Sequence, residues 1–251
     1  MKAVNCSPEL LFIGGWGTTR DIWQGVLAHL PTHSPTWRFH FLDWQDCLQQ
    51  WPTTIKRALA TAAQPPIVVG WSLGAMLALR AAHEFPGKIA GLVLLSAMPR
   101  LTNDGCEAGV TPRILQAMRL RLARNPASVL WDFAGQCLAP DGDQTIRRLF
   151  LRLAANFSAG ELDAGLELLS TLDLCAQVDK IAIPCRLLHG SDDRIVPLAS
   201  AQMVQALLPA ARLLILSGRG HAIPYTSPSE IAQAIEAMHE SIFTSIERTK
   251  S

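Results

Sequence analysis

The sequence has few charged residues and almost no net charge. Charged side chains make up 17% of the chain, and 22 Lys and Arg residues nearly balance 21 Asp and Glu residues. A chain without excess positive charge lacks the electrostatic footprint of a bulk nucleic-acid binder. No run of about 18 apolar residues occurs, so we expect no membrane-spanning helix.

Cysteine is present but never as a C-x-x-C pair. Most of the six cysteines stand among apolar neighbours, as reduced and buried cysteines do. We therefore expect no structural disulfide, no metal site and no cofactor. Residues Met1–Cys6 lack the apolar region of a signal peptide, which favours a cytoplasmic protein with neither a nucleic acid nor a membrane as its partner.

One short stretch combines a buried strand, a sharp turn and a helix. Residues 65–69 read Pro-Pro-Ile-Val-Val, and such an apolar run after a helix stop is typical of a strand buried on both faces of a parallel sheet. Gly70, Ser72 and Gly74 follow in the pattern G-x-S-x-G, and a helix-forming run comes next. This is the pattern of a nucleophile elbow, which holds a serine hydroxyl exposed on a strained turn. The alternative is a serine that merely caps an ordinary helix.

Strands and helices alternate along most of the chain, including a helix predicted over Thr53–Ala63. Such alternation predicts an α/β protein with a mostly parallel, doubly wound sheet. Residues 100–178 break the rhythm with four helical patterns and no strand. We therefore assign residues 1–99 and 179–251 to the α/β core. The helical insertion, residues 100–178, is expected to form a lid over the carboxyl ends of the strands, where ligands bind in such sheets.

A serine hydroxyl becomes a good nucleophile only when a base takes its proton. His221 directly follows the last predicted strand and is the candidate base, whereas His189 falls inside a strand and fits a core residue better. The base needs an acid to orient it. Asp192 and Asp193 follow the preceding strand, and the spacing G-x-x-D-x-x-x-P favours Asp193 without excluding its neighbour. Ser72, Asp193 and His221 then occur in the chain order of the α/β-hydrolases.

Acyl transfer also needs two donors for the oxyanion that forms on the substrate. One is expected to be the backbone N–H of Leu73, the residue after the serine. The other is expected from Trp16, in the glycine-rich turn after the first strand. A simple tight connection is the alternative for that turn.

The predicted lid is rich in arginine. Between Pro112 and Ala155 there are seven arginines and no lysine. Arginine suits paired recognition of carboxylates and phosphates, so the pattern indicates a docking site for an acidic protein or an anionic substrate tail. A solvated helix face is the alternative. The arginines are Arg113, Arg119, Arg121, Arg124, Arg147, Arg148 and Arg152.

With these residues in view, the chain resembles an α/β-hydrolase, and more narrowly the BioH-type pimeloyl-[acyl-carrier protein] methyl ester carboxylesterases of biotin synthesis. Tryptophan at both Trp16 and Trp71, together with a Gly-Leu-Glu-Leu-Leu segment, is the most particular feature. The resemblance rests on Gly15–Trp23, Gly70–Gly74, Ala164–Leu174, Gly190–Pro197, and Gly220–Ala222 with Ser227-Pro228.

The resemblance implies a nucleophile, an acid and a base at Ser72, Asp193 and His221, and oxyanion donors at Trp16 and Leu73. It also implies that lid arginines meet the acyl-carrier protein that bears the substrate. The candidates are Arg121, Arg124, Arg147, Arg148 and Arg152.

The sequence departs from this family at Gly14, where the family has a histidine, and in the loop Asp43–Cys47. The first two strands of the usual sheet are expected to be missing or reduced. A thioesterase, a short-chain esterase, a C–C bond hydrolase and a cofactor-free haloperoxidase-like enzyme remain as alternatives on the same scaffold. A ligand-binding receptor with this fold is the alternative that is not an enzyme, but a pure binder needs no complete set of three catalytic groups.

Overall fold

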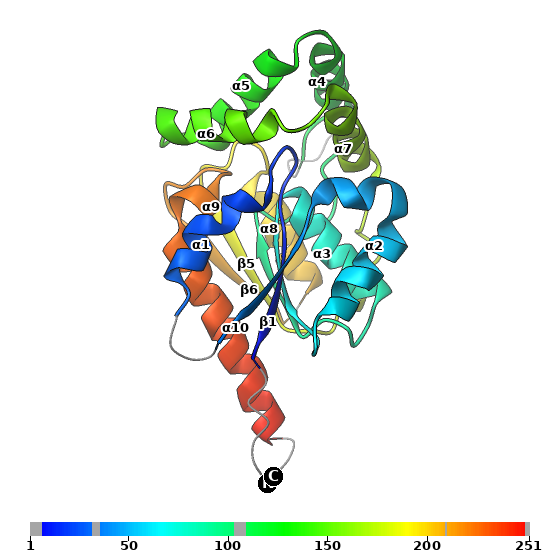
Figure 1. Cartoon of the computed structure of the whole chain (residues 1–251), viewed down its shortest axis with the longest axis vertical. Coiled ribbons are helices and arrows are strands. Elements are labelled where there is room, and N and C mark those ends of the chain that lie inside the picture. Colours follow the sequence, from blue (N-terminus) through cyan, green and yellow to red (C-terminus); the bar gives the residue numbers. More distant parts are fainter. Residues whose placement is uncertain (1–6, 32–35, 103–108, 209, 249–251) are drawn as a thin grey trace.

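A parallel sheet forms the centre of the molecule. The structure is a computed structural model that describes residues 7–31, 36–102, 109–208 and 210–248. In these residues six strands form one sheet in the order β2-β1-β3-β4-β5-β6, with every neighbouring pair parallel (Figure 1). The predicted doubly wound parallel sheet is thereby confirmed. The strands are β1 (Glu9–Ile13), β2 (Arg38–Leu42), β3 (Ile67–Trp71), β4 (Gly91–Leu95), β5 (Cys185–Gly190) and β6 (Arg212–Leu216).

Burial follows the position of each strand in the sheet. Every residue of β1, β3 and β4 is buried, which explains why these strands are apolar apart from Glu9 at the start of β1. The edge strands β2 and β6 are partly open to solvent, and Phe39, Leu214 and Ile215 are each more than 40% exposed. Because β3 lies between β1 and β4, the loops that follow these three strands meet at one edge of the sheet.

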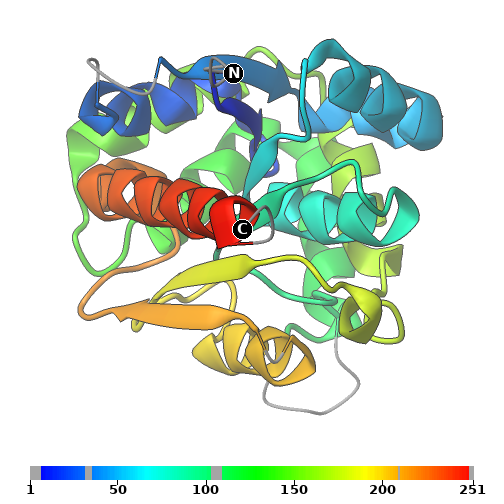
Figure 2. The same ribbon diagram turned by 90° about the horizontal axis from the view of Figure 1, so that it is seen from below.

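Helices cover both faces of the sheet. Figure 2 shows α1 and α10 packed together on one face, with α2, α3 and α8 on the other. Their bounds are α1 (Gln24–His29), α2 (Cys47–Thr61), α3 (Leu73–Glu84), α8 (Leu198–Leu207) and α10 (Pro228–Arg248). Shorter helical turns are η1 (Arg20–Trp23), η2 (Trp44–Asp46), η3 (Val178–Lys180) and α9 (Ile223–Thr226).

Four further helices lie between β4 and β5 in sequence, at the positions of the four helical patterns. They stack beyond the sheet at the upper end of the molecule in Figure 1. Arg119 of α4 holds Asp163 of α7 through two hydrogen bonds of 2.7 and 2.8 Å, so the first and last of these helices are joined. The helices are α4 (Pro112–Arg124), α5 (Pro126–Cys137), α6 (Gln144–Ala154) and α7 (Ala159–Thr171).

Helix α2 begins earlier than the sequence predicted. The expected start was Thr53, whereas the helix extends from Cys47 to Thr61 with a kink at Gln50, where φ is −131° and ψ is 43°. Pro52 causes the discrepancy, because proline lacks an N–H and its ring clashes with the preceding turn. The predicted segment is the part after the kink. The expected loss of strands before β1 concerns a stretch that is largely outside the described residues.

The cysteines that the structure describes are free thiols. Cys47, Cys137 and Cys185 are buried, and Cys175 is half-buried. Burial raises the pKa of Cys47 and of Cys185 to about 12, so both stay protonated at neutral pH. Cys6 and Cys106 lie outside the described residues. Within the described part of the chain, no helix is long and apolar enough to cross a membrane.

Substitutions at two glycines, Gly74 and Gly160, test how tightly the start of α3 packs against β1. A Cβ atom on Gly74 would lie 2.1 Å from the carbonyl oxygen of Ile13, whereas a Cβ on Gly160 of α7 would meet nothing within 4 Å. We expect Gly74→Ala to lower the free energy of unfolding by about 3 kcal/mol or more, because backbone must move. Gly160→Ala should raise it by about 0.4–1 kcal/mol. Urea unfolding measures both, and equal effects would contradict this packing.

Candidate active site

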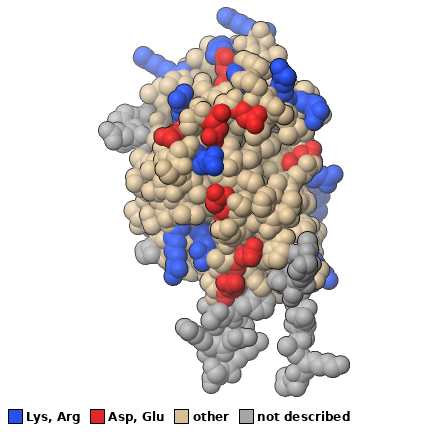
Figure 3. All heavy atoms as spheres, turned by 90° about the vertical axis from the view of Figure 1, so that its left-hand side faces the viewer, with Lys and Arg blue, Asp and Glu red and all other residues tan. Residues whose placement is uncertain are grey.

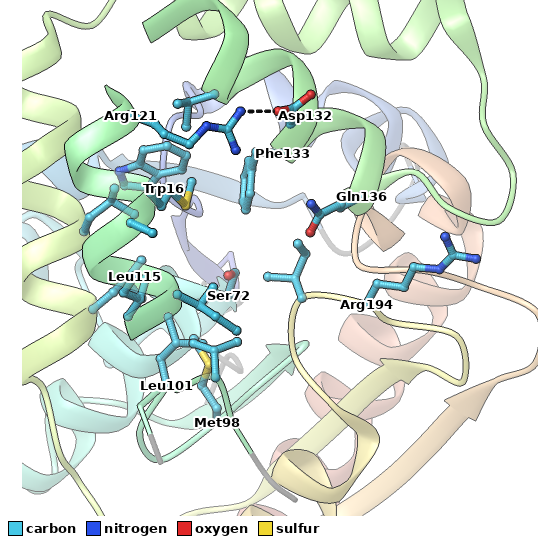
Figure 4. A pocket seen from close by; sticks show the side chains of 18 residues that line it. Trp16, Ser72, Met98, Leu101, Leu115, Arg121, Asp132, Phe133, Gln136 and Arg194 are labelled. Atoms are coloured by element: carbon cyan, nitrogen blue, oxygen red, sulfur yellow. Dashed lines mark hydrogen bonds and ion pairs between the residues drawn. The ribbon is translucent and has the colours of Figure 1, made fainter. Parts of the chain in front are cut away.

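Ser72 sits on the turn between β3 and α3 in a backbone conformation that side-chain-bearing residues avoid. Its φ is 55° and its ψ is −117°. Such a conformation costs on the order of 1–3 kcal/mol and persists only where the surroundings impose it. Here the Ser72 N–H donates to the carbonyl of Leu95 at 2.9 Å, which ties the turn to the end of β4. The side chain lies at the floor of a cavity (Figure 4).

The two glycines of the turn are required by close backbone approach. A Cβ on Gly70 would come within 2.5 Å of the carbonyl oxygen of Gly74, at the start of α3. A Cβ on Gly74 would strike the carbonyl of Ile13, at the end of β1. Side chains at these two positions would therefore collide with the helix and with the neighbouring strand. This contact aims the start of α3 at the carboxyl edge of the sheet.

His221 follows β6 and is fully buried beside Ser72. Its Nε2 lies 3.0 Å from the Ser72 Oγ, and its Nδ1 lies 2.8 Å from the Oδ2 of Asp193. The indole N–H of Trp71, the residue before the serine, donates to the His221 carbonyl at 2.9 Å. The Ala222 N–H donates to the Cys137 carbonyl at the end of α5, also at 2.9 Å. The loop is thus held on both sides of the imidazole.

Asp193, and not Asp192, contacts the imidazole. The Asp192 residue is exposed, whereas the Asp193 carboxylate is buried and accepts three hydrogen bonds. Its Oδ1 accepts the N–H groups of Ile195 and Val196, each at 2.8 Å. Burial alone would raise the pKa of Asp193, but the charge and hydrogen bond of His221, with smaller contributions from its other neighbours, lower it below its ordinary value. The carboxylate is therefore ionised at neutral pH.

Sequence reasoning did not connect His189 with this group. His189 is a buried residue of β5, as expected, but its Nε2 also lies 3.5 Å from the Oδ2 of Asp193. The alternation of strands and loops carries no signal for such a contact. It arises because the loop after β5 folds back onto the end of its own strand.

The two expected oxyanion donors lie next to Ser72. Leu73 is the first residue of α3, so its N–H has no acceptor within the helix. A Cβ on Gly15 would lie 3.3 Å from the Ser72 Cβ, so the turn that carries Trp16 passes directly beside the serine. The Trp16 indole N–H donates to the Leu162 carbonyl of α7 at 2.8 Å, which fixes that turn against the upper helices.

The cavity above Ser72 has a volume of about 300 Å³ and is mainly apolar. Figure 4 shows Met98, Leu101 and Leu115 on one side of the serine. Polar groups are few. An ion pair between Arg121 and Asp132 lies at the upper end, and Gln136 and Arg194 lie on the opposite side. A cavity of this kind suits a methylene chain better than a charged or sugar-like substrate. Gln136 and Arg194 were not among the site residues expected from the sequence.

The arginines of helices α4–α7 fall into two groups. Figure 3 shows Lys and Arg side chains projecting from the upper end of the molecule, which α4–α7 form in Figure 1. Arg121 pairs with Asp132, and Arg147 stacks on the Trp131 ring with 3.7 Å between its guanidinium carbon and the ring centroid. Both are therefore engaged by other residues of these helices. The exposed side chains without an ion pair to a described carboxylate include Arg124, Arg148 and Arg152.

Metal ligands are not gathered in the described part of the chain. No group of three or more His, Cys, Asp or Glu side chains there could hold a metal ion.

Known sequences agree with this architecture. The alpha/beta hydrolase family matches residues 10–234. The pimeloyl-[acyl-carrier protein] methyl ester esterase of Aromatoleum aromaticum is 31% identical over 245 residues, which cover 91% of this chain and 97% of that protein. The esterase of the same name from Edwardsiella ictaluri is 30% identical over 233 residues, covering 88% of this chain and 89% of its own.

Solved structures share the fold at low sequence identity. A bromoperoxidase from Bacillus anthracis has a TM-score of 0.83 and 17% identity, covering 93% of this chain and 92% of its own. An esterase from Exiguobacterium antarcticum has a TM-score of 0.80 and 16% identity, covering 92% and 91%. Family and relatives together give one assignment: the chain belongs to the alpha/beta hydrolase family and is a carboxylic ester hydrolase within it.

Proposed function

We propose that this protein is a serine carboxylesterase of biotin biosynthesis that hydrolyses the methyl ester of pimeloyl-acyl-carrier protein. The observation that carries the proposal is the hydrogen-bonded series Ser72, His221 and Asp193, with separations of 3.0 and 2.8 Å, at the floor of an apolar cavity. The names of the relatives supply the substrate. A biosynthetic role of this kind places the protein in the cytoplasm.

The tautomer of His221 follows from its partners. An ionised Asp193 can only accept, so the proton of a neutral imidazole belongs on Nδ1. The lone pair of Nε2 then points at the Ser72 hydroxyl, 3.0 Å away. This is the arrangement that a general base needs, and Asp193 would stabilise the imidazolium once the proton has moved.

The reaction follows in two halves. Ser72 Oγ attacks the ester carbonyl while His221 takes its proton, and the N–H groups of Leu73 and Trp16 hold the oxyanion. His221 then protonates the departing methoxide, methanol leaves, and an acyl-enzyme remains on Ser72. A water molecule gives its proton to His221 and attacks the acyl carbon. Collapse of that second intermediate returns the proton to Ser72 and releases the pimeloyl carboxylate.

The helical insertion supplies the binding surface in this proposal. Residues 100–178 act as a lid on the core formed by residues 1–99 and 179–251, and the apolar cavity beneath it takes the pimeloyl chain. Each buried methylene contributes about 0.8 kcal/mol, so the chain alone can provide useful affinity. The acyl-carrier protein would then remain outside the cavity, against the lid.

Exposed arginines of the lid are the proposed contacts of this acidic carrier. Arg148 and Arg152 stand one turn apart on α6, so their side chains share a face of the helix. Arg124 is a third exposed candidate, at the end of α4. Arg121 and Arg147 are less available, because Asp132 and Trp131 already hold them.

Replacing the nucleophile tests the reaction directly. With purified protein and pimeloyl-acyl-carrier protein methyl ester, mass spectrometry should detect loss of the methyl group. Ser72→Ala should lower kcat by at least about 10³-fold and abolish labelling by a fluorophosphonate probe. Ser241→Ala is the matched control, because that serine hydrogen-bonds to Met238 on α10. Retention of a tenth of the wild-type kcat by Ser72→Ala would refute the role of Ser72.

Charge reversal on α6 tests the carrier contact. The double variant Arg148→Glu, Arg152→Glu should raise KM for the carrier-linked ester about tenfold, since an exposed ion pair is worth up to about 1 kcal/mol. KM for a small methyl ester should stay unchanged. Lys88→Glu, a charge reversal on an exposed residue after α3, should leave both substrates unaffected. Equal losses on both substrates in the double variant would contradict docking at this face.

A further inference from the structure

His189 is a second histidine beside the proposed catalytic acid. It is 0% exposed and belongs to β5, where its strand partner is Ile215 of β6. Its neighbours Leu187 and Leu188 are apolar and buried. An aliphatic side chain would satisfy this strand without the desolvation cost of an imidazole. The polar ring is therefore expected to serve a purpose that packing does not supply.

The hydrogen bonds of His189 determine where its proton lies. Nε2 is 2.9 Å from the carbonyl oxygen of Val196, which can only accept. Nδ1 is buried and has no hydrogen-bond partner among the described residues. A proton on Nδ1 would be a buried donor without an acceptor, so the neutral ring carries its proton on Nε2. Burial also lowers the pKa of His189 below its ordinary value, and this outweighs the opposing charge of Asp193.

His189, Val196 and Asp193 close a ring of contacts. The Val196 carbonyl accepts from His189, and the Val196 N–H donates to the Oδ1 of Asp193 at 2.8 Å. The same His189 Nε2 lies 3.5 Å from the Oδ2 of Asp193, which is the oxygen that faces His221. The turn between β5 and α8 is thus pinned to its own strand, and the direction of the carboxylate is set with it.

We propose that His189 is a positioning residue: a neutral imidazole that anchors the 193–196 turn through Val196 and so holds the Asp193 carboxylate against His221. The inference rests on the acid role proposed for Asp193. His189 touches neither substrate nor the reacting atoms, and its effect on catalysis passes entirely through that carboxylate. Removing the Nε2 donor should therefore lower kcat only in protein that has aspartate at position 193.

Two matched variants isolate the donor. The amide of Gln can reach the place of the imidazole Nε2, whereas the amide of Asn is shorter and falls near the place of Nδ1. We expect His189→Asn to lower kcat on a small methyl ester roughly 10- to 100-fold with KM nearly unchanged, as displaced catalytic groups do. His189→Gln should retain at least a third of wild-type kcat. Val93→Ala, in the centre of β4, controls for general loss of core stability without a change in kcat.

A double-mutant cycle with Asp193→Asn tests whether His189 acts on catalysis through Asp193. Asp193→Asn alone should lower kcat by about 10³–10⁴-fold, and adding His189→Asn should lower it less than threefold further. Additive losses, or equal kcat for the Asn and Gln variants, would overturn the inference. If Asp193→Asn leaves kcat unchanged, the proposed acid role fails and the inference fails with it.

A measurement on the wild-type protein does not depend on how the variants fold. The ¹⁵N chemical shifts of labelled histidine distinguish a neutral ring protonated at Nε2 from the other two forms. His189 should show the neutral Nε2–H form at pH 7. A charged ring would contradict the neutral form proposed here, and a proton on Nδ1 alone would leave no donor for the Val196 carbonyl, so either result would overturn the proposal.

Discussion

The close approach of α3 to the end of β1 is the constraint on which the site depends. At Gly74 the backbone of the helix passes so near the Ile13 carbonyl that no side chain fits. This forces the turn at Ser72 into a left-handed conformation with φ of 55°. In exchange the serine side chain lies at the carboxyl edge of the sheet, beside the first residue of α3, Leu73, whose N–H has no acceptor within the helix. A longer connection would relieve the strain, but the hydroxyl would no longer have a fixed direction.

Hydrogen bonds that involve backbone groups hold the loops of the proposed base and acid in place. Trp71 immediately precedes the serine, and its indole N–H donates to the carbonyl of His221. This hydrogen bond fixes the position of the imidazole relative to the Ser72 hydroxyl, although Trp71 is not one of the three proposed catalytic residues. Asp193 is fixed in a similar way, by two backbone N–H groups on one oxygen. Because these groups are buried, each hydrogen bond acts in surroundings of low polarity, where a misplaced partner is costly.

The sequence predicted those parts of the structure that follow from local sequence patterns. Continuous apolar runs mark strands buried on both faces, and G-x-S-x-G marks a turn where only glycine fits, so the sheet and the position of Ser72 could be read directly. Contacts between segments that are far apart in the sequence could not be predicted in this way. The spacing favoured Asp193, but only the folded loop shows that Asp193 rather than Asp192 turns inward. Arg121 is engaged because α5 brings Asp132 to it. The kink of α2 was likewise hidden, because a helical turn can precede a proline.

The four upper helices do more than enclose a cavity, because they bond to the loops that carry the reacting groups. In α7, Leu162 accepts from the Trp16 indole, and a Cβ on Gly165 would lie 2.6 Å from the same ring. At the end of α5, the Cys137 carbonyl accepts from Ala222, next to the proposed base. A shift of these helices would therefore reach the oxyanion turn and the imidazole together. The proposed binding of substrate by these helices and the proposed chemistry at the sheet edge are therefore linked through these contacts.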